Sequence, residues 1–448
     1  MSFPPLYGGT FSVSQSVTSL PAYSARDRPS TAGAVRELTE HTFELKDKKK
    51  KPWATLRLKS SARSSTSMPT FLEGERITGS VTLDLSNSEK ILGVSILVRG
   101  HIVTGPSHRD RACFLDVSTP LWLKGMADPR DIASGSQFNG KFSGDYHWPF
   151  AISLPKEVVL PDPAGKNGDV RSYHMPQSFL ERTVRASVIY ELCVHIARSA
   201  FRVDNNLQTM FAYVPAIRPE SPSRGRQLAY RQNGPIPGPD LDPEGWHTLR
   251  PAWVTGTVFN ARRVEIKCVL SLAKPLSYTR GSVIPLSLIY SSNDAQALSL
   301  VCTPTTTNMC LQRQITYTQA SNVAEYSVRS ISVEPPPDFV VEVTRAVWWP
   351  VDDGRGPGSS RFDGEIHLSK SLKPSSNISH FSIVYSVVML PFQVTGFAAH
   401  TSPPTLLKQD IEIATIFPKG PKPRIYSPPR YEPEIGDNMF IPPARGYI

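Results

Sequence analysis

The sequence predicts an all-β protein with two tandem β-sandwich domains of the immunoglobulin-like type. Short runs of alternating apolar and polar residues recur along the chain, and no segment of comparable length has the 3.6-residue period of a helix. Proline is frequent, at 42 of 448 residues, as expected for many short strands joined by turns. The second half of the chain also repeats the layout of the first half.

The first domain is predicted to follow an unstructured tail. Residues 1–50 are rich in Ser, Thr, Pro and charge and have no periodic pattern, so we expect them to be disordered. The domain itself is assigned to residues 51–217. Its first strand is indicated by Ala54, Leu56 and Leu58, which alternate with polar neighbours as in a half-buried strand.

Four further runs continue the first domain. In residues 71–85, Gly74 supplies a turn before a strand. The apolar residues of that strand share one face: Ile77, Val81, Leu83 and Leu85. Residues 91–100 form the next strand, which we expect to be its antiparallel neighbour in the same sheet. Residues 146–155 and 184–196 complete the series.

A Pro/Gly-rich segment separates the two domains. Residues 215–251 are crowded with Pro, Gly and Arg, so we expect no strand there. Residues 218–252 are therefore predicted to be a linker or a surface insertion. The second domain is assigned to residues 253–395, and residues 396–448 to a Pro-rich C-terminal tail.

The second domain repeats a signature of the first. Residues 71–83 and 278–290 share an aromatic residue, a turn glycine three positions later, and then alternating apolar residues. Near the end of each half lies a matching strand, at residues 188–192 and 383–387. This order-preserving similarity favours a duplicated β-domain, the alternative being two unrelated sandwiches.

No constellation of catalytic or metal-binding residues is visible. The chain has no nucleophile elbow, no phosphate-binding glycine loop and no zinc-protease motif, and its ten histidines lack ligand spacing. We therefore expect no enzyme activity, no cofactor and no metal. Trp348 and Trp349 are more readily explained as core residues than as an exposed patch.

The cysteines indicate a reducing compartment. Five are present, with no Cys-x-x-Cys pair, which argues against a disulfide framework or a zinc site. Cys193, inside a strand-like run, is interpreted as a small buried hydrophobe. No secretory signal and no run of about 18 apolar residues is found, so we expect a cytosolic protein.

Two copies of Pro-Pro-x-Tyr and a looser copy lie near the ends of the chain. The full copies are Pro4, Pro5, Leu6 and Tyr7, and Pro428, Pro429, Arg430 and Tyr431; the looser copy is Leu20, Pro21, Ala22 and Tyr23. Independent placement of 42 Pro and 15 Tyr in 448 residues predicts about 0.1 such tetrapeptides. The alternative is that Pro-rich termini carry such strings without a function.

The tetrapeptide has the shape that a WW domain recognises. Two prolines hold the backbone near polyproline II, and the aromatic groove of a WW domain accepts their rings while the tyrosine enters a second pocket. Little conformational entropy is lost on docking, so a short segment can bind usefully. We therefore predict that these segments bind WW domains.

The net charge of +10 favours acidic partners. It supports attraction to acidic lipid head groups or phosphorylated tails, with Arg57 and Lys59 on an exposed strand face as candidate contacts. The alternative is an ordinary solvated basic surface. Nucleic acid is not expected as a partner.

Beyond these patterns, the chain resembles a known family. Residues 73–83, 98–100 and 148–155 are similar to the arrestin N-terminal domain, and residues 272–281 to the start of the arrestin C-terminal domain. The resemblance spans roughly residues 53–395. With the Pro-Pro-x-Tyr copies, it identifies the chain as similar to fungal α-arrestins, the arrestin-related trafficking adaptors, and implies arrestin-type sandwiches.

The resemblance implies a non-enzymatic adaptor function. Such proteins recruit WW-containing HECT-type ubiquitin ligases to plasma-membrane transporters or receptors, whose cytoplasmic tails they bind and whose ubiquitination, endocytosis and sorting they promote. A cytoplasmic protein peripheral to the plasma membrane or endosomes is then expected. Mobile lysines near the motifs are candidate ubiquitin acceptors: Lys48, Lys49, Lys50, Lys51, Lys419 and Lys422.

Two other function classes remain to be weighed. A structural trafficking subunit of arrestin fold, like the arrestin-shaped component of retromer, would act without a ligase. A β-sandwich enzyme or carbohydrate-binding module is disfavoured by the absence of a signal peptide and a catalytic cluster. The buried polar core and the locking C-terminal strand of visual and β-arrestins are not recognisable in this sequence.

Overall fold

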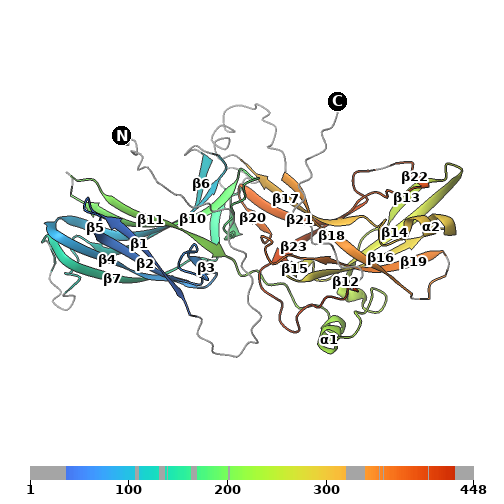
Figure 1. The fold of residues 1–448 in the computed structure, drawn as a ribbon, viewed down its shortest axis with the longest axis horizontal. Helices are drawn as coiled ribbons and strands as arrows, with labels where there is room; N and C mark the ends of the chain where they lie inside the picture. Colours follow the sequence, from blue (N-terminus) through green and yellow to red (C-terminus); the bar gives the residue numbers. More distant parts are fainter. Residues whose placement is uncertain are drawn as a thin grey trace, which may run out of the picture.

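The predicted fold class is confirmed: the chain forms two tandem β-sandwich domains (Figure 1). The computed structural model describes residues 37–105, 110–130, 137–138, 140–162, 169–199, 202–318, 339–352, 354–356, 358–401 and 403–428. Strands dominate both domains, and the first domain holds β1–β11 while the second holds β12–β23.

Eleven strands form the described part of the first domain. They are β1 (Thr39–Lys46), β2 (Pro52–Ser60), β3 (Thr70–Leu72), β4 (Arg76–Glu89), β5 (Ile91–Val103), β6 (Arg111–Leu123), β7 (Phe142–Ser153), β8 (Glu157–Pro161), β9 (Val170–His174), β10 (Ser187–Arg198) and β11 (Asn205–Val214). One sheet has the order β1-β2-β4-β7 and the other β3-β11-β10-β5-β6, while β8 and β9 form a separate pair.

The described part of the second domain and the segment before it contain twelve strands and three short helices. They are α1 (Arg224–Gln232), the 3-10 helix η3 (Pro243–Gly245), β12 (Trp246–Thr248), β13 (Ala252–Val258), β14 (Arg262–Ala273), β15 (Ser277–Thr279), β16 (Val283–Ser291), α2 (Ala295–Val301), β17 (Met309–Tyr317), β18 (Phe339–Val351), β19 (Ser359–His367), β20 (Ser376–Ile378), β21 (Phe381–Met389), β22 (Phe397–Ala399) and β23 (Leu407–Ala414). The strands pair in the order β15-β23-β21-β17-β18-β19-β16-β14-β13-β22, with β12 beside β14 and β20 beside β21.

The second domain repeats the strand order of the first. The run β15-β23-β21-β17-β18 corresponds to β3-β11-β10-β5-β6, and β19-β16-β14-β13 corresponds to β7-β4-β2-β1. In each domain a three-residue strand pairs in parallel with the last long strand, β3 with β11 and β15 with β23. The main difference is the pairing of β18 with β19, which joins both halves of the second sandwich into one path. This shared topology favours duplication over two unrelated sandwiches.

Corresponding residues have the same structural roles in the two domains. Gly74 and Gly281 both have positive φ, at 84° and 80°, so each supplies the turn that the sequence predicts. Tyr190 on β10 and Tyr385 on β21 are buried, and their hydroxyls donate to the carbonyls of Pro176 (2.6 Å) and Lys373 (2.7 Å). Each bond ties a strand of the sandwich to a loop that precedes it in the chain.

The predicted alternation of core residues is confirmed. Ala54, Leu56 and Leu58 of β2 are buried, and so are the four apolar residues predicted for one face of β4: Ile77, Val81, Leu83 and Leu85. Trp348 is also buried, as expected, while Trp349 is half-buried. These side chains face the inside of a sandwich, where a second sheet removes them from water.

The predicted pairing of residues 91–100 with the preceding strand is wrong. They belong to β5, which pairs with β6 and β10 in one sheet, whereas β4 pairs with β2 and β7 in the other. Only Lys90 lies between β4 and β5. Alternation indicates that one face of a strand is buried, but both sheets face the same interior, so the pattern does not say which sheet a strand joins.

Cys193 is not buried as predicted. It is half-buried on the outer face of β10, because its neighbours Leu192 and Val194 point into the core. Its thiol lies 3.8 Å from the side-chain oxygen of Asn206. The period of a strand therefore overrides the tendency of cysteine to be buried.

The predicted tails and linker contain structure. β1 lies in residues 1–50, and β22 and β23 lie in residues 396–448, so both tail boundaries are wrong. β1 and β23 carry many charged residues on their outer faces, which gives them the composition of a solvated tail. The predicted linker, residues 218–252, contains α1, and its three-residue β12 pairs with β14, although no strand was expected.

Removal of the buried tyrosine hydroxyl should destabilise the first domain. Tyr190→Phe leaves the carbonyl of Pro176 without its donor, and we expect a loss of about 1–3 kcal/mol in the free energy of unfolding, measured by urea denaturation. Tyr385→Phe should have a similar effect on the second domain. Tyr317→Phe, at a half-buried position of β17, is the control and should change stability by less than about 0.5 kcal/mol.

Candidate partner-binding sites

Most residues of the predicted WW-binding motifs lie outside the part of the chain that the structure describes. This holds for Pro4, Pro5, Leu6, Tyr7, Leu20, Pro21 and Tyr23, and for Pro429 and Tyr431. Pro428 is described, and it is half-buried. The structure therefore bears only on the chain that leads into the C-terminal motif.

That chain, residues 415–428, runs back along the segment between the two domains; we refer to residues 415–428 as the strap. The Thr415 hydroxyl donates to the carbonyl of Pro215 (2.6 Å) and accepts from the backbone N–H of Ile217 (2.9 Å). Arg218 donates to the carbonyl of Phe417 at 2.6 Å. These bonds join segments about 200 residues apart in sequence, so the strap is part of the folded structure.

The segment between the domains is anchored by a buried arginine. Arg226 on α1 donates to the carbonyls of Lys274 and Gly245, both at 2.6 Å, and its guanidinium lies 5.1 Å from the centre of the Trp246 ring. Burial lowers the pKa of this guanidinium, although nearby Tyr230 opposes the shift. A charged group at such a position requires these partners, and it fixes α1 on the second domain.

Sequence reasoning missed α1, although its signals are present. Ser223 caps the helix by accepting from the backbone N–H of Arg226, and Asn233 ends it in the left-handed conformation. The buried residues at i, i+3 and i+4 are Arg226, Ala229 and Tyr230. Only one of the three is aliphatic, so the buried face of α1 does not show the spacing of apolar residues by which an amphipathic helix is recognised in a sequence.

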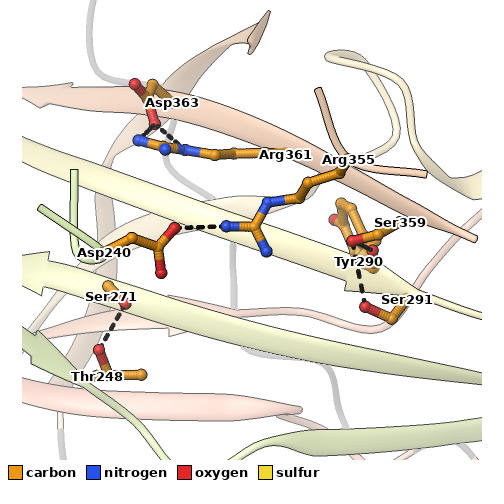
Figure 2. Close-up of polar contacts among 9 residues, drawn as sticks. All are labelled: Asp240, Thr248, Ser271, Tyr290, Ser291, Arg355, Ser359, Arg361 and Asp363. Atoms are coloured by element: carbon orange, nitrogen blue, oxygen red, sulfur yellow. Dashed lines mark hydrogen bonds and ion pairs between the residues drawn. The ribbon is translucent and has the colours of Figure 1, made fainter. Parts of the chain in front are cut away.

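Some polar contacts hold the rest of the segment on the second sheet, and others join residues within that sheet (Figure 2). Arg355 pairs with Asp240 at 2.5 Å, and Arg361 of β19 pairs with Asp363 at 3.0 Å. A Cβ at Gly238 would lie 2.4 Å from the Arg361 guanidinium, so a larger residue there would displace the end of the Arg361 side chain. Two hydroxyl pairs lie nearby, Thr248–Ser271 at 2.8 Å and Ser291–Ser359 at 3.4 Å.

The two domains meet in a seam of charged side chains that are buried or half-buried. Arg313 on β17 makes a bidentate ion pair with Glu181 of the first domain, with both N–O distances 2.7 Å. Arg280 donates to the side-chain oxygen of Gln177 at 3.1 Å. Burial lowers the pKa of Lys373, with Glu181 opposing the shift and Arg280 and Arg313 adding to it. Three cations and one carboxylate thus share this seam.

A cleft of about 570 Å³ lies next to the seam, between the two domains. Its lining comes from both sides: His174, Met175, Gln177, Ser376, Asn377 and Ile383 are among the residues. The lining mixes apolar side chains with amide and hydroxyl groups, and its size would admit a short peptide or a small molecule.

The positive charge of the candidate basic contacts, Arg57 and Lys59, is partly offset by an acidic neighbour. Arg57 and Lys59 are exposed on the outer face of β2, as expected. Glu40 of β1 lies opposite Lys59 in the ladder and is also exposed. An acidic cross-strand neighbour reduces the local positive potential.

The candidate ubiquitin acceptors lie in ordered parts of the chain, not in mobile tails as expected. Lys48, Lys49, Lys50 and Lys51 are exposed in the turn between β1 and β2, where Asp47 accepts from two backbone N–H groups and Lys51 pairs with Asp84 at 2.8 Å. Lys419 and Lys422 are exposed on the strap. All six remain accessible to a modifying enzyme.

The described ranges contain no group of three or more His, Cys, Asp or Glu side chains that could hold a metal ion. Within the same ranges, no helix is long and apolar enough to span a bilayer. A scan against models of protein families gives no match, and a search of curated proteins gives none either.

The ion pair between the domains should be energetically coupled. A double-mutant cycle with Glu181→Gln and Arg313→Gln should give a coupling of about 1–3 kcal/mol, because the two side chains are only 24% and 14% exposed. The same cycle on Glu342 and Arg345, where the arginine side chain is 60% exposed, should give less than about 1 kcal/mol. Equal coupling in the two cycles, measured by urea denaturation, would contradict the expectation that the pair at the seam is shielded from water.

Proposed function

We propose that this chain is a non-enzymatic adaptor with an arrestin-like fold. It recruits a WW-containing HECT-type ubiquitin ligase to the cytoplasmic tails of membrane transporters or receptors and thereby promotes their ubiquitination, endocytosis and sorting. It acts in the cytoplasm at the surface of the plasma membrane or endosomes. The observation that carries the proposal is the pair of Pro-Pro-x-Tyr motifs flanking two tandem β-sandwiches.

The repeated topology supports this proposal because arrestins consist of two β-sandwiches in tandem. The strap adds a second support. It leads from the last strand of the second domain to Pro428, the first residue of the C-terminal motif, and is bonded to the fold along its length. Pro428, the first residue of the motif, therefore has a defined position relative to the fold.

Several motifs on one scaffold can bind a ligase that carries several WW domains. Once the first motif is bound, binding of the second is intramolecular, and avidity can exceed the affinity of one site by about 10²–10⁴. The weak affinity of single WW–peptide contacts is then sufficient. The looser copy at Leu20, Pro21 and Tyr23 would add a third contact.

The adaptor proposal predicts a specific loss of ligase binding. Replacing both Tyr7 and Tyr431 by Ala should abolish co-precipitation of a HECT-type ligase, because each substitution empties the tyrosine pocket of its WW domain. Thermal unfolding should be unchanged. Retained binding would refute the docking role of these motifs. The control is Tyr317→Phe, a tyrosine substitution outside the motifs, which should leave binding unchanged.

The second candidate function is a trafficking subunit of arrestin fold that acts without a ligase. The extensive contacts between the two domains favour a rigid structural role equally well. Deletion of residues 1–30 and 429–448 separates the candidates, since a structural subunit would function normally without them. The C-terminal cut belongs at residue 429, because residues 420–428 contribute to the fold and their loss would affect either function.

A further inference from the structure

Glu365 is a buried carboxylate on a sheet face that should be open to water. It lies on β19, and residues 361, 363 and 367 on the same face are all half-buried. Glu365 is only 1% exposed. Something outside the sheet must therefore cover it, and a buried carboxylate is tolerated only when its oxygens are bonded.

The end of the strap supplies both the cover and the bonds. The backbone N–H of Tyr426 donates to one oxygen of Glu365 at 2.8 Å, and that of Ser427 donates to the other at 3.1 Å. Ser427 is only 8% exposed, and its hydroxyl lies 3.2 Å from Nε2 of His367. One carboxylate thus accepts hydrogen bonds from two consecutive backbone amides. Such hydrogen bonds are charge-assisted and directional.

A second set of contacts holds the same segment to α1. Arg424 donates to the carbonyl of Tyr230 at 2.6 Å and to the side-chain oxygen of Asn233 at 3.0 Å. The rings of Tyr426 and Tyr230 stack with centres 6.3 Å apart. We call residues 424–427, docked on Glu365 and α1, the latch.

The latch ends where the C-terminal motif begins. Pro428 follows Ser427 directly and is half-buried in the docked state. A WW domain must enclose the ring of the first proline of Pro-Pro-x-Tyr in its aromatic groove. Because Pro428 is half-buried and the preceding amide is bonded to Glu365, we infer that a WW domain cannot enclose the Pro428 ring without displacing the latch.

We propose that the latch is an autoinhibitory contact that limits the access of WW domains to the C-terminal motif. The inference rests on the proposed function, because it names the control of one of the same docking sites. Only the fraction of molecules with an open latch binds, so the apparent affinity of the motif is lowered by that fraction. The N-terminal motifs are separate from the latch in sequence, and in this proposal they make the first contact with the ligase.

The test compares a peptide with the full-length chain. The full-length protein carries Tyr7→Ala and Tyr23→Ala, so that only the C-terminal motif reports, and the probe is an isolated WW domain of a HECT-type ligase. A peptide of residues 424–436 gives the affinity without the latch. We expect the full-length chain to bind about tenfold more weakly than the peptide.

Two substitutions open the latch from opposite sides. Glu365→Gln replaces one acceptor oxygen by an amide group that faces a backbone N–H. Arg424→Ala removes the hydrogen bonds to α1 and leaves the residues of the sheet unchanged. Each should bring the affinity of the full-length chain to within about twofold of the matching peptide. The control is Asp363→Asn on the same face of β19, which pairs with Arg361 and should change nothing.

Amide hydrogen exchange tests the latch independently of any ligase. The amides of Tyr426 and Ser427 should exchange slowly in the parent and in Asp363→Asn, and rapidly in Glu365→Gln and Arg424→Ala. Rapid exchange in the parent, or equal affinities of peptide and full-length chain, would overturn the inference and leave the proposed function intact. A peptide that binds no WW domain would instead overturn the docking role of the motif, and the autoinhibition with it.

Discussion

The whole structure depends on one constraint, that each strand must bury alternate side chains against a second layer. β2 and β4 satisfy it with Leu56 and Val81, whose faces meet the opposite sheet of the first sandwich. The second domain satisfies it with the same strand order. Its outer face is an exception, because α1 and the strap cover it and bury Glu365 and Arg226. A third layer on one side of the second sandwich is the most distinctive feature of the fold.

That third layer depends on polar bonds in addition to the packing of buried side chains such as Ala229 and Tyr230. Arg226 and Glu365 are each buried, and each is bonded to the backbone of a segment that crosses the sheet. Such contacts are directional, so they hold a segment in one register more strictly than apolar packing does. They also depend on charge, and loss of one partner leaves the other unsatisfied. A segment held in this manner can be released as a unit.

The proposed adaptor function and the latch fit into one physical picture. Two sandwiches joined through the Glu181–Arg313 pair form a platform. In the proposed function, the Pro-Pro-x-Tyr motifs would connect that platform to a ligase. The latch bonds the amide of Ser427 to Glu365 of β19, and Pro428, the next residue and the first of the C-terminal motif, is half-buried. Engagement of the N-terminal motifs first and the C-terminal motif second would make full avidity conditional on opening of the latch.

The sequence by itself determined the fold class, the core positions of β2 and β4, and the turns at Gly74 and Gly281, because these depend on local period and backbone freedom. It also located the motifs. Only the tertiary structure decided which sheet β5 joins, since both sheets share one interior. It alone decided that β1, β23 and the strap are structured, because their stability comes from partners distant in sequence. The latch is likewise a tertiary feature: Glu365 and Ser427 are 62 residues apart, and no local pattern links a carboxylate to the amides it binds.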